Sequence, residues 1–409
     1  MELFKRENYL KKIRGFYHAS DIIKVITGVR RCGKSSLMQI VAEELRSAGI
    51  EENRIIFLNL DKREYRKIKT ADHLDELIAG FPQSRELMYL FIDEVQNVAD
   101  FEEVLNSYRE DGGYSIFITG SNSYLLSGEL ATKLTGRYIE IEMFPLTFDE
   151  YLQIKAFYQK PVDLNLSVEL NRYILEGGFP RAILIDGLED KRRYTESVIT
   201  EIFEKDIRRR VKIKDREAFE AVRHFIVNNF GATMSISSLQ AALTRIGMTI
   251  TRATVSKYIT ALVEAKILYA CDRFDMKSKR ALKGEKKYYL SDLSFYFCDN
   301  TDNRINYGPV LENLVYFYAR SRSLSVSVGQ IGTLECDFIL RNREMDYAYL
   351  QVAYSIAQSR ETEEREYRPL EQIRDNYPKY LLTTDYLLQK RSGVRHVNLM
   401  EFMKNGTEF

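Results

Sequence analysis

The stretch Gly28-Val29-Arg30-Arg31-Cys32-Gly33-Lys34-Ser35 decides the fold of the N-terminal part of this chain. It matches the pattern G-x-x-x-x-G-K-[ST], and it lies between an apolar strand-like run, Ile22–Thr27, and a helical pattern that begins at Lys34. The alternative is a glycine-containing turn that matches by chance, and both flanks argue against it. The context therefore predicts a phosphate-binding loop.

Each residue type in this loop has a physical reason. Gly28 and Gly33 let the backbone curl until successive N–H groups point at phosphate oxygens. Lys34 would bring a positive charge to the β- and γ-phosphates, the Ser35 hydroxyl can ligate Mg²⁺, and the helix presents its positive dipole end. The predicted ATP-binding set is Gly28, Arg30, Arg31, Cys32, Gly33, Lys34, Ser35 and Ser36.

A second part of a nucleotide site follows at Asp93-Glu94. The preceding run, Met88–Ile92, is continuously apolar, as in a parallel strand that is buried on both faces. An acidic pair there could simply open a surface loop, but together with the phosphate loop it predicts an ATP site. Asp93 would hold Mg²⁺ through water, and Glu94 would polarise the water that attacks the γ-phosphate.

Strand-like and helix-like patterns alternate over the first 150 residues. The strand candidates are Ile22–Thr27, Arg54–Leu60, Met88–Asp93, Ser115–Thr119 and Tyr138–Met143. This βαβ order predicts an α/β fold over residues 1–147, with a parallel sheet between two layers of helices.

Two more candidates for the ATP site adjoin these strands. Asn122 or Ser121, after the strand that ends at Thr119, could sense the γ-phosphate or could cap a helix. Arg137, just before the last strand, could be a solvated surface charge or a finger that neutralises transition-state charge in a neighbouring subunit.

The composition limits the classes of partner, metal site and cellular location that this protein can have. The 60 Lys and Arg residues balance 59 Asp and Glu residues, so no overall field favours nucleic acid or membrane. The four cysteines have no C-x-x-C spacing, which argues against zinc or disulfides. No apolar run approaches the about 20 residues of a membrane span, and the N-terminus opens no signal peptide. We expect a soluble cytoplasmic protein that has no membrane partner.

The alternation stops at Phe148, and residues 148–212 have a helical pattern broken at Gly177-Gly178-Phe179-Pro180-Arg181. Such a helical lid would close over the nucleotide and place Arg181 near the phosphates. Alternatively, the glycines and the proline only mark a turn, and Arg181 is solvated.

Residues 213–300 resemble a winged helix. The helix Ser235–Ile246, a tight turn and a second helix from Thr251 are typical of a helix-turn-helix. The strands Ile267–Phe274 and Lys286–Leu290 would follow, joined by a basic wing-like loop. The domain could bind double-stranded DNA or serve only as a spacer or protein contact. The candidate DNA contacts are Arg252, Ser256, Lys257, Lys277, Lys279 and Lys283.

Residues 301–409 are predicted to form a helix, three strands, a helix and a strand. The strands are Leu324–Val328, Leu334–Leu340, Tyr347–Ala353 and Lys379–Thr383, and the second helix covers 363–376. Because strand side chains alternate, Glu335 and Asp337 share one face.

Together these residues resemble a widespread group of prokaryotic ATP-binding proteins, in which an AAA-type ATPase core is joined to a winged helix and a C-terminal domain of restriction-nuclease type. The motifs that carry the resemblance are Gly28–Ser35, Phe91–Gln96, Thr119–Ser123, Leu134–Arg137, Gly177–Arg181 and Tyr288–Asp292. The resemblance implies the strand order 5-1-4-3-2 and the sensor, finger and lid roles.

The last domain departs from the nuclease pattern. Such nucleases hold Mg²⁺ with two carboxylates and use a lysine to assist the attacking water. Glu312 or Glu335 could accompany Asp337, but Gln351 stands for the second carboxylate and Ala353 for the lysine. A neutral amide is a weaker ligand for a hard cation, so we expect a degenerate site. Lys379 is the nearest replacement lysine by sequence.

The sequence thus indicates a Mg-ATPase of the AAA class whose nucleotide state controls a C-terminal half that binds DNA or protein. One alternative is a metal-dependent nuclease gated by ATP. Another is a signalling switch that turns over slowly and assembles on binding a partner. The finger role of Arg137 further requires that copies of the chain form a homo-oligomer.

Overall fold

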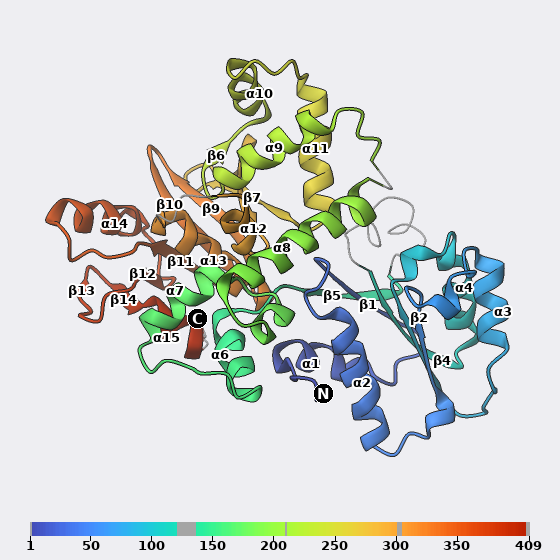
Figure 1. The fold of residues 1–409 in the computed structure, drawn as a ribbon. Coiled ribbons are helices and arrows are strands. Elements are labelled where there is room, and N and C mark those ends of the chain that lie inside the picture. The colour runs from blue at the N-terminus through green and yellow to red at the C-terminus, as the bar shows by residue number, and fades with distance from the viewer. Residues whose placement is uncertain (1, 121–135, 209–210, 301–304, 406–409) are drawn as a thin grey trace. The chain divides into compact units, whose positions relative to one another are not determined.

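The computed structural model describes residues 2–120, 136–208, 211–300 and 305–405. These residues fall into two compact units. Unit 1 comprises residues 1–144 with 264–266, and unit 2 comprises residues 145–263 and 267–409 (Figure 1). The predicted division of the chain into four domains, with boundaries at residues 147, 212 and 300, stays a prediction.

Unit 1 is built on a five-stranded parallel sheet. The strands are β1 (Ile23–Gly28), β2 (Ile55–Asn59), β3 (Met88–Asp93), β4 (Tyr114–Thr119) and β5 (Tyr138–Met143). They lie in the order β2-β3-β4-β1-β5, and every neighbouring pair is parallel. The predicted α/β class and strand order are confirmed. Because the strands are parallel, all of their carboxyl ends share one edge of the sheet.

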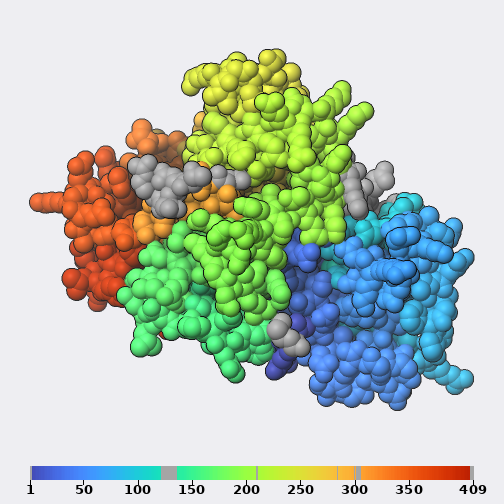
Figure 2. Space-filling view, viewed as in Figure 1, coloured from blue at the N-terminus to red at the C-terminus, as the bar shows by residue number. Residues whose placement is uncertain are grey.

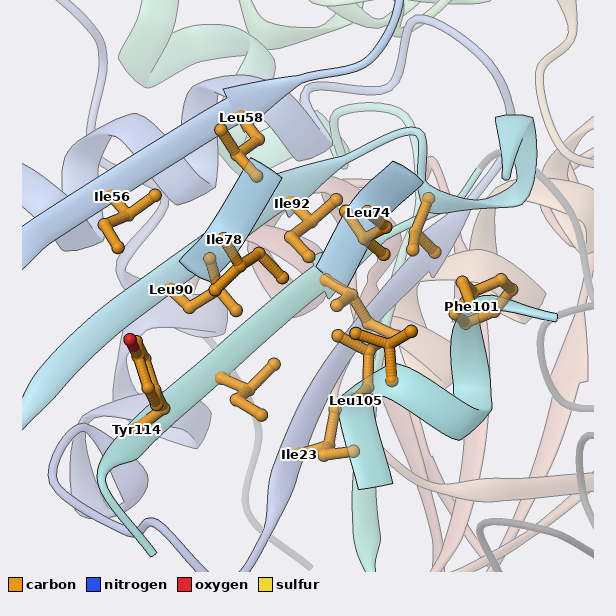
Figure 3. Close-up of a cluster of buried hydrophobic side chains, with 14 of the residues drawn as sticks. Ile23, Ile56, Leu58, Leu74, Ile78, Leu90, Ile92, Phe101, Leu105 and Tyr114 are labelled. Atoms are coloured by element: carbon orange, nitrogen blue, oxygen red, sulfur yellow. The ribbon is translucent and has the colours of Figure 1, made fainter. Parts of the chain in front are cut away.

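The helices of unit 1 cover this sheet. They are α1 (Glu7–Ile13), α2 (Lys34–Ser47), α3 (Ala71–Ala79) and α4 (Phe101–Asp111). β3 and β4 are buried along their whole length, as expected for parallel strands that are covered on both faces, and their sequences are mainly apolar. Figure 3 shows Leu90 and Ile92 of the sheet in one cluster with Leu74 of α3 and Leu105 of α4. This packing fixes the strand ends where the polar residues follow.

Unit 2 begins with helices, as the sequence predicts. They are α6 (Phe148–Phe157), α7 (Leu166–Glu176), the 3₁₀ helix η6 (Pro180–Leu184), α8 (Leu188–Ile202) and the π-helix η7 (Phe203–Ile207). A Cβ on Gly177 would lie 2.1 Å from Asp292 Oδ1, and the Gly178 amide donates to Asp292 Oδ2 at 2.7 Å. Two motifs more than 100 residues apart in the sequence therefore meet through one buried carboxylate.

Three helices, a short strand and a hairpin follow. They are α9 (Arg216–Asn228), β6 (Thr233–Met234), α10 (Ile236–Arg245), α11 (Arg252–Glu264), β7 (Leu268–Asp275) and β8 (Arg280–Leu290). The expected loop over 275–285 is wrong, because β8 already begins at Arg280 and only residues 276–279 make the turn. Asp275 pairs with Arg280 and Phe274 with Ala281, so ladder hydrogen bonds convert most of the expected loop into strand.

One mixed sheet of nine strands extends from this hairpin to the C-terminal region. The later elements are α12 (Ser294–Asp299), α13 (Tyr307–Ser321), β9 (Ser325–Ile331), β10 (Leu334–Arg341), β11 (Tyr347–Val352), α14 (Arg360–Gln372), β12 (Lys379–Thr383), β13 (Lys390–Arg391), β14 (Val394–Asn398) and α15 (Leu399–Asn405). The order is β13-β14-β12-β11-β10-β9-β7-β8-β6. β7 pairs with β9 in parallel, so the predicted boundary at residue 300 divides a single sheet.

The predicted helix over 363–376 is displaced. Helix α14 begins at Arg360, because the Ser359 side chain caps it by accepting from the Thr362 amide at 3.1 Å. It ends at Gln372, since Ile373 is extended. The prediction also omitted β13, β14 and α15. None of the helices among the described residues combines the length and the apolar character that a bilayer crossing requires.

Candidate functional site

The phosphate loop follows β1 at the edge where the parallel strands end. Gly28 has φ +143°, and a Cβ there would lie 2.2 Å from the carbonyl oxygen of Met143 on β5. Gly33 has φ +108°, in the left-handed region that glycine adopts easily. The neighbouring strand and the backbone angles therefore require both glycines.

Lys34 is buried and lies across its own loop. Its Nζ donates to the carbonyl oxygens of Gly28 at 2.9 Å and Val29 at 3.1 Å. Ser35 and Ser36 follow it in the first turn of α2, where the free N–H groups of a helix can bind an anion. Lys34, Ser35 and Ser36 of the predicted set therefore lie together in the first turn of α2, directly after the loop.

The structure adds an unpredicted brace to this loop. Arg6 is buried, and its Nη1 donates to the carbonyl oxygens of Cys32 at 3.0 Å and Phe144 at 2.8 Å. Cys32 is itself buried, and its Sγ lies 3.6 Å from the Met143 carbonyl oxygen. No local pattern links Arg6 to a loop 26 residues later, so the sequence could not have revealed it.

Asp93 ends β3 and is held from both neighbouring strands. Asn59, the last residue of β2, donates through Nδ2 to Asp93 Oδ2 at 3.0 Å. Thr119, the last residue of β4, donates through Oγ1 to Asp93 Oδ1 at 2.5 Å. Neither residue was predicted, although a polar residue that ends each flanking strand was a usable signal.

Glu94 follows in a left-handed conformation, with φ 59° and ψ 46°. Its amide donates to Thr119 Oγ1 at 3.0 Å, so a single hydroxyl positions both acidic residues. The side-chain amide of Gln96 donates to Glu94 Oε2, and the Arg30 guanidinium lies 3.5 Å from the same oxygen. Burial raises the pKa of Glu94, while the charges of Lys34 and Arg30 oppose this rise. A carboxyl with a raised pKa suits a general base.

Arg137 lies at the end of the sheet where the parallel strands begin, opposite to the end where the phosphate loop follows β1. Tyr138, which follows it, pairs with Ile23 at the start of β1, whereas the phosphate loop begins at the far end of β1. A strand of this length spans roughly 15–20 Å. Arg137 is 47% exposed, and its Nη1 lies 3.7 Å from Glu110 Oε1. It therefore cannot reach the ATP site of its own chain.

Three further candidates for this site came from the sequence, namely Ser121, Asn122 and Arg181. Ser121 and Asn122 lie outside the described residues. Arg181 is exposed in unit 2. Its contact with nucleotide stays a prediction.

The candidate DNA-binding residues lie on the surface of unit 2. Arg252 and Lys257 of α11 are exposed, Ser256 is half-buried, and Lys277 and Lys279 are exposed in the β7–β8 turn. Lys257 Nζ donates to the Lys212 carbonyl oxygen at 2.7 Å. The segment around α10 and α11 forms the yellow surface at the top of Figure 2.

Three of the four residues of the predicted degenerate site lie around one cavity. Glu312 of α13, Asp337 of β10 and Gln351 of β11 line one cavity of about 490 Å³. The structure adds Glu366 of α14, which accepts from Gln351 Nε2 at 3.1 Å. The sequence did not point to this carboxylate, which comes from a helix, whereas β11 supplies only the amide of Gln351.

A lysine also stands beside these carboxylates. Lys287 Nζ lies 3.0 Å from Glu312 Oε2 and 2.7 Å from Glu335 Oε1. Lys379, the nearest replacement lysine by sequence, donates through Nζ to the Asp375 carbonyl oxygen at 2.8 Å, and its role at this site stays a prediction. Lys287 comes from β8, which the one-domain nuclease pattern does not include. Burial and the nearby Glu312 raise the pKa of Asp337 well above its usual range.

Within the described part of the chain, no group of three or more His, Cys, Asp or Glu side chains could hold a metal ion. This applies to the cavity around Asp337 as well. The carboxylates there are already engaged by Lys287, by Gln351 and by the Val352 amide, which donates to Asp337 Oδ2 at 2.8 Å.

Comparisons with known proteins give two family matches and several relatives. Residues 20–152 match the family described as an AAA domain, and residues 167–298 match a domain of unknown function. An uncharacterized protein of Haemophilus influenzae is 34% identical over 409 residues, 98% of each chain. The uncharacterized protein MJ1544 of Methanocaldococcus jannaschii is 29% identical over 361 residues, 85% of this chain and 78% of that protein.

A solved structure shares the fold. The Walker-type ATPase PABY2304 of Pyrococcus abyssi aligns with a TM-score of 0.50 and 15% identity, over 72% of this chain and 95% of that chain. At this identity the likeness concerns the fold alone. It agrees with the sheet order and the phosphate loop of unit 1.

Proposed function

This chain belongs to one family with the uncharacterized Haemophilus influenzae protein and carries an AAA domain of P-loop ATPase-like fold, and we propose that it binds and hydrolyses Mg-ATP. The observation that carries the proposal is the hydroxyl of Thr119, which donates to Asp93 and accepts from the Glu94 amide. This hydroxyl thereby holds both acidic residues at the edge of the sheet where Lys34 begins its helix, which supports Asp93 as the proposed metal ligand and Glu94 as the proposed general base.

The residues at this edge fit a magnesium ion. The Ser35 hydroxyl and the Asp93 carboxylate are hard oxygen donors, and Mg²⁺ commonly keeps its other ligands as water and phosphate. Bound Mg²⁺ would neutralise charge on the phosphates. Lys34 would exchange two loop carbonyls for phosphate oxygens, and Glu94 would accept a proton from the attacking water.

The direct test is magnesium-dependent release of phosphate from ATP by the intact protein, with EDTA as the control. Steady turnover without a partner would support the ATPase and exclude the signalling switch that turns over slowly. Gel filtration with and without a slowly hydrolysed ATP analogue would show whether nucleotide drives assembly. A protein that binds no ATP would contradict the proposal.

We further propose that the nucleotide state controls binding of double-stranded DNA or a protein by unit 2. Helices α10 and α11 with the β7–β8 hairpin support a winged helix, because the basic side chains of α11 and of the turn are exposed. DNA is the first candidate, since a helix reads base edges and a cationic turn contacts phosphates.

Replacing Lys277, Lys279 and Lys283 together with Ala is expected to weaken DNA binding about equally across sequences. Each of these lysines would neutralise a phosphate, so the slope of log K against log salt should fall by roughly 0.9 for each phosphate that is no longer neutralised. Binding should be measured at several salt concentrations on two unrelated duplexes.

Changes at Arg252 and Lys257 are the matched comparison, since α11 would face base edges. They should alter sequence preference more than the salt slope. An unchanged slope in the triple lysine variant would assign this surface to a protein partner instead.

The ATP-gated nuclease remains a second candidate, because Glu366 and Lys287 stand beside Asp337 and Glu312. We nevertheless expect no DNA cleavage with Mg²⁺ or Mn²⁺, with or without ATP. Lys287 is held by two carboxylates, and Ala353 has no group that could assist a water. A missing general acid–base group typically costs about 10²–10⁴-fold in rate.

The assay needs supercoiled and linear DNA, intact protein, and Asp337→Ala as the control. Cleavage in both proteins would indicate a contaminating nuclease and leave the expectation intact. Cleavage that requires metal and disappears in Asp337→Ala would overturn it and place the gated nuclease first.

A further inference from the structure

Arg30 carries a charge at the centre of the phosphate loop, and it faces the acidic side of the site. Only 8% of its side chain is exposed. Its Nη2 lies 3.5 Å from Glu94 Oε2, and its Nη1 lies 4.0 Å from Asp61 Oδ2. Asp61 follows β2 and accepts from Asn97 Nδ2 at 3.0 Å. The guanidinium thus faces carboxylates that follow two adjacent strands.

These contacts restrain the residue that would act as the base. Glu94 is 11% exposed at its side chain, and its Oε2 is the oxygen that both Gln96 and Arg30 approach. Its backbone lies in the left-handed region, and the Glu94 backbone N–H donates a hydrogen bond to Thr119 Oγ1. A carboxylate oxygen that is engaged by an amide and a guanidinium has fewer lone pairs left to accept a proton from water.

We propose that Arg30 is a positioning residue that holds Glu94 to the phosphate loop and exchanges this carboxylate for the γ-phosphate when ATP binds. The inference rests on the proposed ATPase function. A guanidinium binds phosphate and carboxylate through the same planar fork, so the two anions compete for it. The phosphate with more negative charge wins, and Glu94 becomes available to the water beside it.

The γ-phosphate is the expected competitor because of where Glu94 acts. Glu94 would activate the water that attacks this phosphate, so a donor 3.5 Å from its carboxylate lies at the γ end of the site. ADP lacks that phosphate and would leave the contact in place. The exchange would therefore release Glu94 from Arg30 when ATP binds and not when ADP binds.

A double-mutant cycle on nucleotide affinity tests this exchange without measuring hydrolysis. The probes are a fluorescent non-hydrolysable ATP analogue and fluorescent ADP, both with Mg²⁺. Glu94→Gln removes the competing charge, so it should tighten analogue binding by about three- to tenfold and leave ADP binding unchanged. In an Arg30→Ala background the same change should give no tightening.

Two further variants test whether the effect is specific to the Arg30 guanidinium or follows from any loss of charge in the loop. Arg31→Ala removes an equal charge from the same loop, and there Glu94→Gln should still tighten analogue binding. Arg30→Lys keeps the charge but loses the planar fork, so part of the coupling should return. This variant also provides the measurement if Arg30→Ala fails to fold.

Equal tightening in the presence and absence of Arg30 would overturn the inference, because direct repulsion between Glu94 and the γ-phosphate would then explain the effect. Equal tightening for ADP would overturn it as well. A wild-type protein that binds neither probe would instead remove the proposed ATPase function, so the two failures are distinguishable.

Discussion

Lys34→Ala is expected to abolish nucleotide binding, whereas Glu94→Gln should preserve binding and stop hydrolysis. Lys34 would contact phosphate in the bound ground state, and its ammonium already lies across the loop on two carbonyl oxygens. Glu94 would act on water only on the way to the transition state, so its loss should appear in kcat. Removing such a base typically lowers the rate by about 10²–10⁴-fold.

The measurements are equilibrium binding of labelled ATP and steady-state phosphate release, with circular dichroism as the control for folding. Lys34→Arg tests whether charge alone suffices, because its planar head should fit the narrow loop poorly. Hydrolysis by Glu94→Gln at the wild-type rate would show that another group is the base.

Arg137→Ala should lower turnover by a large factor without weakening ATP affinity. A finger that neutralises transition-state charge can contribute about 10³–10⁵-fold to kcat. This prediction assumes that the site is completed by a neighbouring subunit. The structure supports this assumption, because Arg137 lies at the edge of the sheet opposite to its own phosphate loop. The finger role therefore requires a second copy of the chain.

Mixing supplies the test. Arg137→Ala and Glu94→Gln are each expected to be nearly inactive, but their mixture should recover activity. In the mixture, Arg137 of a Glu94→Gln subunit would complete the site of a neighbouring Arg137→Ala subunit, which still has Glu94. The mixing ratio should be varied, since the recovered rate should pass through a maximum. A protein that stays monomeric during turnover would exclude this role.

The ATP site was predictable because its main residues are close together in the sequence or end an apolar strand. Lys34 lies within the loop motif, and Asp93 closes a run buried on both faces. The sheet order came from the resemblance, and the structure confirms it. Asn59 and Thr119 could have been found by asking which polar residues end the flanking strands.

Other contacts depend on tertiary structure that no local pattern encodes. Arg6 reaches the loop because α1 packs beside the end of β5. Glu366 and Lys287 approach the C-terminal cavity from a helix and from a strand of a different predicted domain. The hairpin was misjudged for a similar reason, because the basic composition of 275–285 describes solvent exposure and not backbone pairing.

The parallel pairing of β7 with β9 bears on how this family can evolve. Arg273, Phe274 and Asp275 align with Val328, Gly329 and Gln330, and a shift of register by one residue would reverse which side chains face the core. Recombination that exchanged the sequence after residue 300 for an unrelated domain would leave β7 with an unpaired backbone edge. The segments before and after residue 300 therefore depend on each other for backbone pairing, and we expect a chain cut at that point to lose this part of the sheet.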